Sequence, residues 1–482
     1  MRSLLPGKWS WSLFVALSLF VSHLLVSDSL FAQDDQKQTA PPNVILFLAD
    51  DMGWRDLACY GNEFHETPNI DQLAADGIRF TDAYAACPVC SPTRASILTG
   101  NYPATINLTD FIPGHYRPFA KLTVPEFNQQ LPDTQETLAE IMKSANYQTG
   151  SFGKWHLGGQ GSLPPDHGFT DWVVSGGRHF YPNFRTNPGR KIEDGTYLAD
   201  FLTSEAERFL EENQDRPFFL YLPHYAVHIP LEAKKELIKK YEDKQKPAYG
   251  VNNPIYAAMV EHLDQSVGRL TQKLEELDLA ENTIFIFYSD NGGLFKRFDG
   301  NGPDVMSNEP LRAEKGTLYE GGVRVPFIVR WPGKVQAGTE SAAPVCSVDL
   351  LPTIVEMTGQ SNQQKKQTDG VSLASLILKQ EPLAERSLYW HYPHYHHCDP
   401  SGSIRSGRYK LIEDFQEGRL ELYDLETDLG EIHNLAEEKP ELAATMQQQL
   451  ADWRAIVGAN MPVKNPGWNP KRAEEWHRRP RK

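Results

Sequence analysis

The chain has 482 residues, of which 40% are hydrophobic, 23% charged and 11% aromatic, and this globular composition excludes collagen-like, coiled-coil and disordered classes. Its mean hydropathy of −0.49, with a single apolar stretch near the N-terminus, excludes a multi-span membrane protein. The 63 Asp and Glu residues outnumber the 48 Lys and Arg residues, and the net charge of −15 argues against sequence-independent binding of nucleic acid, although a local cationic pocket for an anionic substrate is compatible with it.

The N-terminal segment predicts export. Arg2 and Lys8 precede an apolar run at 11–26, and small residues ending at Ala32 come before a polar stretch. This order is typical of a secretory signal peptide, and the run is short for a membrane span. We therefore expect residues 1–32 to be a signal peptide of a secreted or periplasmic protein with no stable membrane anchor; a retained anchor is the alternative.

Unbroken apolar runs predict buried strands at 44–49, 218–222, 283–288 and 326–329. Strands of a parallel sheet that is covered by helices on both faces have this pattern. Amphipathic stretches between these runs predict helices that start at Thr67-Pro68, cover 134–143 with Asn146 as left-handed C-cap, and cover 255–277. The alternation predicts an α/β domain with a large, mainly parallel sheet flanked by helices.

The alternation of strands and helices stops near residue 380. Short strands are predicted at 388–390, 406–412 and 420–424, followed by a helix at 440–456. We therefore expect a catalytic domain over 33–380 and a small C-terminal α+β domain over 381–482. The basic end, Arg478 to Lys482, is expected to be a frayed, solvated tail.

Carboxylates follow two of the predicted strands. Asp50 and Asp51 follow the first strand, and Asp290-Asn291 follows the run at 283–288. In open α/β sheets, sites form beyond the carboxyl ends of the strands. Three converging carboxylates repel one another unless they share a hard divalent cation, and oxygen ligands favour Ca²⁺ or Mg²⁺ over zinc. Either segment alone is also compatible with simple turn residues.

The five cysteines, at 59, 87, 90, 346 and 398, are too few and too scattered for a disulfide scaffold. Cys87-Pro88-Val89-Cys90 has the C-x-x-C spacing of a redox pair, and a structural thiol before a helix is another interpretation. The longer string from Cys90 to Gly100, Cys-Ser-Pro-Thr-Arg-Ala-Ser-Ile-Leu-Thr-Gly, is far more specific than either.

This string resembles the type I sulfatases, in which that cysteine is oxidised to Cα-formylglycine. The resemblance covers nearly all of 42–435 and includes, in the family's order, segments at 43–51, 68–71, 153–158, 228–230 and 290–293, Lys315 with 320–322, and 349–353. It implies an alkaline-phosphatase-like fold and an arylsulfatase-like sulfuric ester hydrolase. It also implies a formylglycine-generating maturation enzyme as a partner.

The resemblance assigns roles to individual residues. Its metal ligands correspond to Asp50, Asp51, Asp290 and Asn291, with the modified Cys90 also facing the ion. That ion is usually Ca²⁺, and Mg²⁺ is the weaker alternative. Its active-site cations correspond to Arg94, Lys154 and Lys315, and its two histidines to His156 and His228.

These residue types suit an anionic ester with a poor leaving group. The site must attract the anion, supply a nucleophile and protonate the departing oxygen. The resemblance implies that one hydroxyl of a formylglycine hydrate attacks sulfur, that His228 protonates the alcohol, and that His156 accepts a proton as sulfate is expelled. Cys87, three residues before Cys90, is a departure from the family pattern. A disulfide between Cys87 and an unmodified Cys90 would block activation.

Aromatic and imidazole side chains suggest a sugar-binding surface. Arg178, His179 and the stretch 391–397, which includes His394, combine aromatic faces with hydrogen-bonding groups. We therefore expect a sulfated carbohydrate or an aryl sulfate as the substrate. The histidine-rich stretch is also compatible with a zinc site or a structural loop. Two other functions stay open: a phosphate mono- or diester hydrolase, and a carbohydrate-binding protein with an inactive site.

Overall fold

The computed structural model describes residue 7, residues 40–297 and residues 300–479. The predicted signal peptide, apart from Gly7, lies outside the described residues and stays a prediction. The chain divides into two units, Met1–Pro41 and Pro42–Lys482, and every element below belongs to the second. No helix of the described residues is long and apolar enough to cross a membrane.

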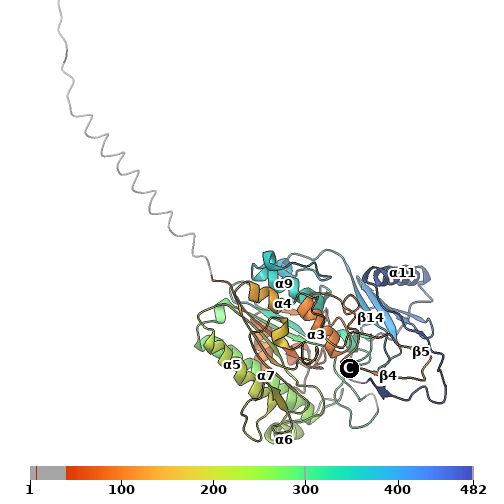
Figure 1. The fold of residues 1–482 in the computed structure, drawn as a ribbon, viewed down its shortest axis with the longest axis horizontal. Coiled ribbons are helices and arrows are strands. Elements are labelled where there is room, and N and C mark those ends of the chain that lie inside the picture. Colours follow the sequence, from red (N-terminus) through yellow and green to blue (C-terminus); the bar gives the residue numbers. More distant parts are fainter. Residues whose placement is uncertain (1–6, 8–39, 298–299, 480–482) are drawn as a thin grey trace, which may run out of the picture. The chain divides into compact units, whose positions relative to one another are not determined.

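A nine-stranded sheet forms the centre of this unit (Figure 1). Its strands lie in the order β12 (Thr339–Ser341), β2 (Ile78–Phe80), β11 (Phe327–Arg330), β10 (Thr283–Ser289), β1 (Asn43–Ala49), β9 (Phe218–Pro223), β6 (Gln148–Gly153), β7 (Asp171–Gly176) and β8 (Arg185–Asn187). The five strands from β10 to β7 are mutually parallel, as is the pair β12–β2. A mainly parallel sheet is therefore confirmed.

One predicted strand runs in the opposite direction from the expectation. The run at 326–329 forms β11, which pairs antiparallel with β10 and with β2. After β10, the chain does not cross back over the sheet but stays at the carboxyl edge, where Gly292 N donates to Gly322 O at 3.0 Å. It passes through α8 (Glu320–Val323) and re-enters the sheet from that edge. An apolar run indicates that a strand is buried on both faces, but it does not indicate whether the strand runs parallel or antiparallel to its neighbours.

Helices cover both faces of the sheet, which explains the unbroken apolar runs. Val44, Leu46 and Leu48 face a core that includes α3 (Cys90–Thr99), α4 (Leu138–Ser144), α9 (Leu350–Met357) and α10 (Ala374–Lys379). Ile45 and Phe47 face a core that includes α2 (Pro68–Ala75), α5 (Leu198–Glu212), α6 (Lys235–Asp243) and α7 (Pro254–Glu276). Figure 1 shows α3, α4 and α9 on one side of the sheet and α5, α6 and α7 on the other.

Capping residues set the helix ends. The helix predicted from 134 begins instead at Leu138, because Thr137 and Glu140 form a capping box and residues 132–135 form a turn. Asn146 adopts φ +64°, the predicted left-handed conformation, but it lies one residue past the C-cap, which is Ala145. Asn253 caps α7 and accepts from Ile255 N and Tyr256 N. Short 3₁₀ helices complete the connections: η1 (Ala58–Tyr60), η2 (Pro164–His167), η3 (Ala280–Asn282), η4 (Ser347–Asp349) and η5 (Ser361–Gln363).

The predicted C-terminal α+β region is confirmed as an antiparallel sheet with one long helix. The sheet contains β14 (Ser387–Tyr392), β15 (Ser401–Ser406), β16 (Tyr409–Asp414) and β17 (Leu420–Asp424), and α11 (Pro440–Val457) packs against it. The single strand predicted at 406–412 is wrong, because Gly407 at φ +56° turns the chain between β15 and β16. This core also includes residues near the two-stranded sheet of β3 (Ala83–Tyr84) and β13 (Val345–Cys346).

The last segment of the chain is ordered against an early loop. β18 (Val463–Lys464) pairs with β5 (Leu122–Thr123), and β19 (His477–Arg478) pairs with β4 (His115–Tyr116). Arg479 forms an ion pair with Glu126 at 2.9 Å. The expectation of a frayed tail is therefore wrong for Arg478 and Arg479, while residues 480–482 lie outside the described part.

Candidate active site

Two neighbouring strands deliver the acidic groups to one edge of the sheet. β1 and β10 are parallel, and their last residues, Ala49 and Ser289, are register partners. The residues that follow therefore meet: Asp51 N donates to Asp290 Oδ1 at 3.1 Å, and Asn291 Nδ2 donates to Asp51 Oδ1 at 2.8 Å. Asp51 adopts φ +62°, a left-handed conformation that is uncommon for non-glycine residues.

Cys90 is the first residue of α3 and lies against these carboxylates. Its Sγ is 3.5 Å from Asp50 Oδ1 and 3.8 Å from Asp51 Oδ1. Burial raises the pKa of the Cys90 thiol to about 12, so the unmodified side chain is a protonated thiol and a poor nucleophile. Cys87 and Cys90 are both free, and Cys87 Sγ points to Thr109 O at 3.9 Å. The redox interpretation of the C-x-x-C spacing gains no support from this arrangement.

Three buried cations pair with the three carboxylates. One turn along α3 from Cys90, Arg94 donates from Nε to Asp290 Oδ2 at 2.8 Å. Lys154 Nζ donates to Asp50 Oδ2 at 2.6 Å, and Lys315 Nζ donates to Asp51 at 2.6 and 2.7 Å. Lys315 Nζ is also 3.4 Å from Cys90 Sγ.

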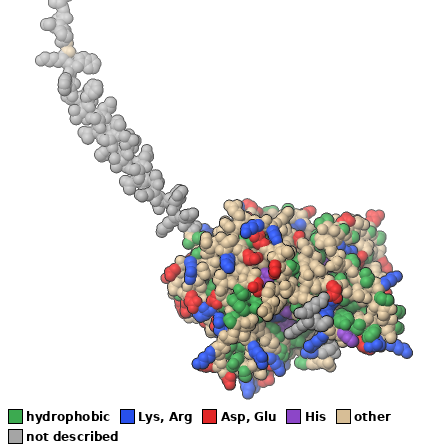
Figure 2. Space-filling model, viewed as in Figure 1, with side chains coloured by type: hydrophobic (Ala, Val, Ile, Leu, Met, Phe, Trp, Pro, Cys, Tyr) green, Lys and Arg blue, Asp and Glu red, His purple; other side chains and the backbone are tan. Residues whose placement is uncertain are grey.

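Burial and neighbouring charges shift the pKa values of Asp51 and Asp290 in opposite directions. Burial opposes ionisation of Asp51, but the ammonium group of Lys315 outweighs it and holds the pKa of Asp51 well below its usual range. Burial and the charge of Asp50 raise the pKa of Asp290 to about 6 despite Arg94. Figure 2 shows acidic and basic side chains intermixed on one face of the molecule. The three cations of the site, in contrast, are buried.

Each histidine has one ring nitrogen fixed by a backbone carbonyl. His156 Nε2 donates to Ile112 O at 2.6 Å, which leaves Nδ1 buried, with no hydrogen-bond partner among the described residues, as a lone-pair acceptor. His228 Nδ1 donates to Ile229 O at 2.5 Å, and its Nε2 is 3.6 Å from Asp51 Oδ2. Burial lowers the pKa of His228 to about 3 and that of His156 well below its usual range.

The donor set fits a hard divalent cation. Ligand atoms of Asp50, Asp51, Cys90 and His228 lie within 4.8 Å of one another. Asn291 Oδ1 is buried without a hydrogen-bond partner among the described residues, so this oxygen is available for a cation. This group differs from the predicted ligand set by including His228 and by lacking Asp290. Both oxygens of Asp290 already accept hydrogen bonds, from Asp51 N and from Arg94.

The residues expected to bind substrate fall in different surroundings. Arg178 is half exposed and pairs with Glu232 at 2.7 Å, while His179 is buried and donates to His228 O at 3.0 Å. His394 is fully buried and hydrogen-bonded to Thr109 Oγ1 at 2.8 Å, a position that gives no support to direct substrate contact. Among the described residues the acidic cluster is the one group of His, Cys, Asp and Glu close enough to hold a metal, so the stretch 391–397 forms none.

Tyr225 is a residue of the site that the sequence reasoning missed. Its ring lies 5.6 Å from Lys154 Nζ and 5.2 Å from the ring of His228. This face can hold the lysine through a cation–π contact and can stack against a ring of the substrate. The available signal was its position three residues before His228 and two residues after β9, a strand that neighbours β1.

Comparisons with known proteins agree with this geometry. The Sulfatase family model matches residues 42–360, and the N-sulphoglucosamine sulphohydrolase C-terminal model matches residues 313–455. A protein named Sulfatase from Formosa agariphila is 32% identical, over 94% of this chain and 95% of that protein. Human N-acetylgalactosamine-6-sulfatase is 34% identical, over 73% of this chain and 68% of that protein.

A solved structure is also similar to this chain. The complex of Ps i-CgsB with k-i-k-neocarrahexaose has a TM-score of 0.73 and 29% identity, over 89% of this chain and 94% of that chain. The sheet and its site define a hydrolase with the alkaline-phosphatase-like fold, a large mixed sheet covered by helices on both faces. Within that class, the chain belongs to the sulfatase family and is a sulfuric ester hydrolase. The predicted fold class, family and enzyme class are confirmed.

Proposed function

We propose that this protein is an exported sulfatase that releases inorganic sulfate from a sulfated carbohydrate, using Cys90 after its oxidation to formylglycine. One observation carries the proposal: Cys90 opens α3 with its Sγ between Asp50 and Asp51 and 3.4 Å from Lys315. A side chain in this place contacts carboxylates and a cation together. Burial makes the thiol itself a poor nucleophile, which favours the modified form.

A divalent cation completes the charge balance of the site. Asp50, Asp51, Asn291 and the modified Cys90 would hold it, and Ca²⁺ is favoured over Mg²⁺ because most of these donors are carboxylate and amide oxygens. When bound, the ion supplies positive charge that attracts a sulfate monoanion. With Lys154, Lys315 and Arg94 nearby, the site is locally cationic inside an acidic protein.

The side chains of the site then perform the proton transfers. One hydroxyl of the formylglycine hydrate passes its proton to the adjacent Asp50 carboxylate and attacks sulfur while the bond from sulfur to the ester oxygen breaks, and His228 donates the proton that the alcohol carries away. The charge of a bound sulfate ester raises the pKa of His228 and favours its protonated form. The free Nδ1 of His156 accepts the proton of the second hydroxyl, sulfate leaves, the aldehyde is restored and water rehydrates it.

A carbohydrate substrate is supported by the named relatives and by the aromatic face of Tyr225. N-acetylgalactosamine-6-sulfatase is named for a sulfated sugar, and Ps i-CgsB was solved with an oligosaccharide. Arg178 is half exposed near His228, where its guanidinium group can contact a polar substituent of the sugar. Export rests on residues 1–32, and N-terminal sequencing of the mature protein tests it.

A mass spectrum of the tryptic peptide 80–94 tests the modification. Protein co-expressed with a formylglycine-generating enzyme is expected to carry an aldehyde in place of the Cys90 thiol and to hydrolyse 4-nitrophenyl sulfate faster than 4-nitrophenyl phosphate. Cys90→Ala is expected to lose turnover and keep its fold, whereas the matched variant Cys87→Ala keeps turnover. Full activity of Cys90→Ala would refute the mechanism, and a preference for phosphate by orders of magnitude would favour a phosphate ester hydrolase.

A further inference from the structure

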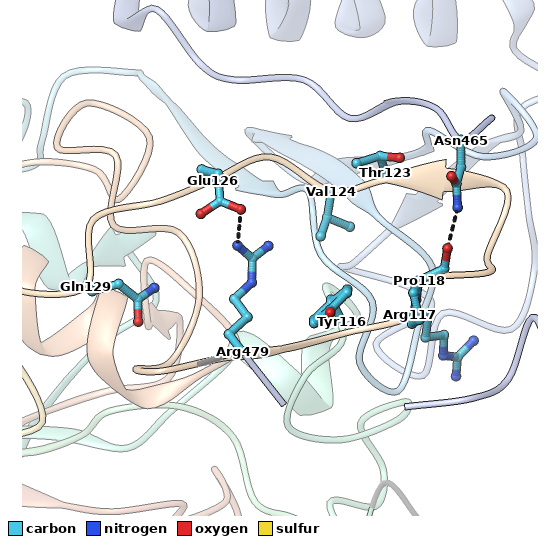
Figure 3. Close-up of a pocket in the computed structure, with 9 residues that line it drawn as sticks. All are labelled: Tyr116, Arg117, Pro118, Thr123, Val124, Glu126, Gln129, Asn465 and Arg479. Atoms are coloured by element: carbon cyan, nitrogen blue, oxygen red, sulfur yellow. Dashed lines mark hydrogen bonds and ion pairs between the residues drawn. The ribbon is translucent and has the colours of Figure 1, made fainter. Parts of the chain in front are cut away.

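A pocket lies beside the C-terminal segment, and its lining includes none of the active-site residues. Its volume is about 430 Å³, and its lining combines an aromatic ring, an apolar side chain, uncharged polar groups and charged groups of both signs (Figure 3). The residues that matter for its chemistry are Tyr116, Arg117, Val124, Glu126, Asn465 and Arg479. A ring face, an aliphatic wall and several hydrogen-bonding groups form a surface that suits a sugar ring.

The C-terminal segment builds this pocket. The strand pairs β18–β5 and β19–β4 hold residues 463–478 against the early loop. Asn465 Nδ2 donates to Pro118 O and to Ala120 O, each at 2.8 Å, and fixes the rim between the two strand pairs. The two family models match no residue beyond 455, so this wall of the pocket is not part of either matched range.

The side chains of the two arginines of the pocket are largely covered, and their acidic partners are exposed. The side chain of Arg479 is 9% exposed and that of its partner Glu126 is 78% exposed, and the corresponding values for Arg117 and Glu474 are 15% and 81%. Ion pairs with an exposed partner are weak. An anion from solution can therefore replace either glutamate. Arg479 Nε also has no hydrogen-bond partner among the described residues.

The pocket and the active site share one loop, residues 110–116. Ile112 O accepts from His156 in the active site, and Gly114 O accepts from Arg479 N at 3.4 Å. These two carbonyls are two residues apart, which separates their Cα atoms by at most about 7 Å. A polysaccharide that fills the active site can therefore reach the pocket within a few sugar units.

We propose that this pocket binds an anionic sugar unit of the same oligosaccharide whose sulfate ester occupies the active site, with Arg479 as the main contact. This inference rests on the proposed carbohydrate sulfatase function and adds to it a preference for polyanionic chains over single sugars. Arg479 pairs with the sulfate or carboxylate group of that unit, and Tyr116 packs against its ring.

Binding without turnover tests the proposal. The full-length Cys90→Ala protein is run in native gels that contain ι-carrageenan, chondroitin sulfate, heparin or neutral dextran. Retardation by at least one anionic polysaccharide and none by dextran is expected. Adding Arg479→Gln is expected to raise the apparent Kd at least tenfold, whereas Arg472→Gln, which removes the same charge outside the lining where Arg472 stacks 3.5 Å from Phe119, leaves it unchanged.

A second variant keeps the arginine and removes its competitor. Glu126→Gln is expected to bind the same polysaccharide as tightly as the parent or more tightly, with an unchanged melting temperature. The proposal is overturned if no anionic polysaccharide is retarded, if dextran is retarded equally, if Arg479→Gln and Arg472→Gln have the same effect, or if Glu126→Gln weakens binding. Failure of the proposed function appears separately, as wild-type protein that hydrolyses no sulfate ester.

Discussion

Lys315 donates from Nζ to both carboxylate oxygens of Asp51, at 2.6 and 2.7 Å, although 264 residues separate the two along the chain. The backbone sets up this contact, because Lys315 N bonds to Gly293 O and Gly316 N bonds to Pro88 O. The loop that follows Asp290 is thus fastened both to its own start and to the segment before Cys90. A sulfate ester beside Cys90 would compete with Asp51 for this ammonium group.

Lys315→Met is therefore expected to slow turnover rather than to unfold the protein. Loss of one preorganised donor to developing charge lowers kcat by about 10²–10³-fold. The measurement is kcat on 4-nitrophenyl sulfate, with the formylglycine content checked by mass spectrometry. The exposed Lys334→Met is the matched control and should retain the wild-type rate. A Lys315→Met enzyme with unchanged kcat would remove this lysine from the reaction.

Removal of divalent cations is expected to lower both stability and activity. Without an ion, Asp50 and Asp51 lie side by side in a buried site, and the pKa of Asp290 is raised to about 6. A ligand that binds only the folded state adds about 2.7 kcal/mol at 100 times its Kd. The melting temperature should fall after EGTA treatment and should recover with Ca²⁺ more fully than with Mg²⁺.

A matched variant separates the metal site from general salt effects. Asp51→Asn should show a smaller response to added Ca²⁺ than the wild type, while Asp133→Asn, at an exposed position, should respond normally. An EGTA-treated protein with unchanged melting temperature and rate would contradict a functional cation at this site.

The central sheet and most of the site were predictable because their signals are local. An apolar run such as 44–49 reports burial on both faces, and the polar residues that follow it report the end of a strand. Parallel pairing of β1 with β10 then brings Asp51 to Asp290 without further information. The string at Cys90 added the family, and with it Lys154 and Lys315.

What the sequence left open depends on contacts between distant segments. His394 stands in a histidine-rich stretch that resembles a binding surface, yet it is buried, hydrogen-bonded to Thr109 and packed against Phe127, both far away in sequence. Arg478 stands in a basic tail, yet strand pairing with His115 orders it. The direction of β11 depends on where the chain runs between 290 and 326. Such outcomes are decided by tertiary partners, which composition and periodicity do not encode.

Lys410 is expected to be a strong contributor to stability. It is fully buried, with Nζ 2.7 Å from Glu320 Oε1 and 3.0 Å from Glu431 Oε1. Removing one partner of a buried ion pair leaves uncompensated charge and costs about 3–5 kcal/mol. Lys410→Met should therefore lower the free energy of urea unfolding by about this amount. The exposed Lys379→Met should change it by no more than about 0.5 kcal/mol, and equal effects for the two would show that the buried network contributes little.

Asp110 is expected to make the protein less stable as the pH rises towards neutrality. Burial raises the pKa of Asp110 to about 7, and its Oδ2 has no hydrogen-bond partner among the described residues. In the unfolded chain the pKa of an aspartate is about 3.9, so the folded state binds the extra proton between these two values. Stability then falls as the pH rises from about 4 to about 7, and it levels off above that range.

Asp110→Asn should remove this loss, because an amide carries no charge and its oxygen can still accept from Phe111 N and Tyr392 Oη. The free energy of unfolding of Asp110→Asn relative to wild type should rise through this range, by up to about 1.4 kcal/mol for each pKa unit of the shift. Urea unfolding at a series of pH values measures it, with the exposed Asp133→Asn as control. Parallel curves for Asp110→Asn and wild type would mean that Asp110 ionises normally in the folded protein.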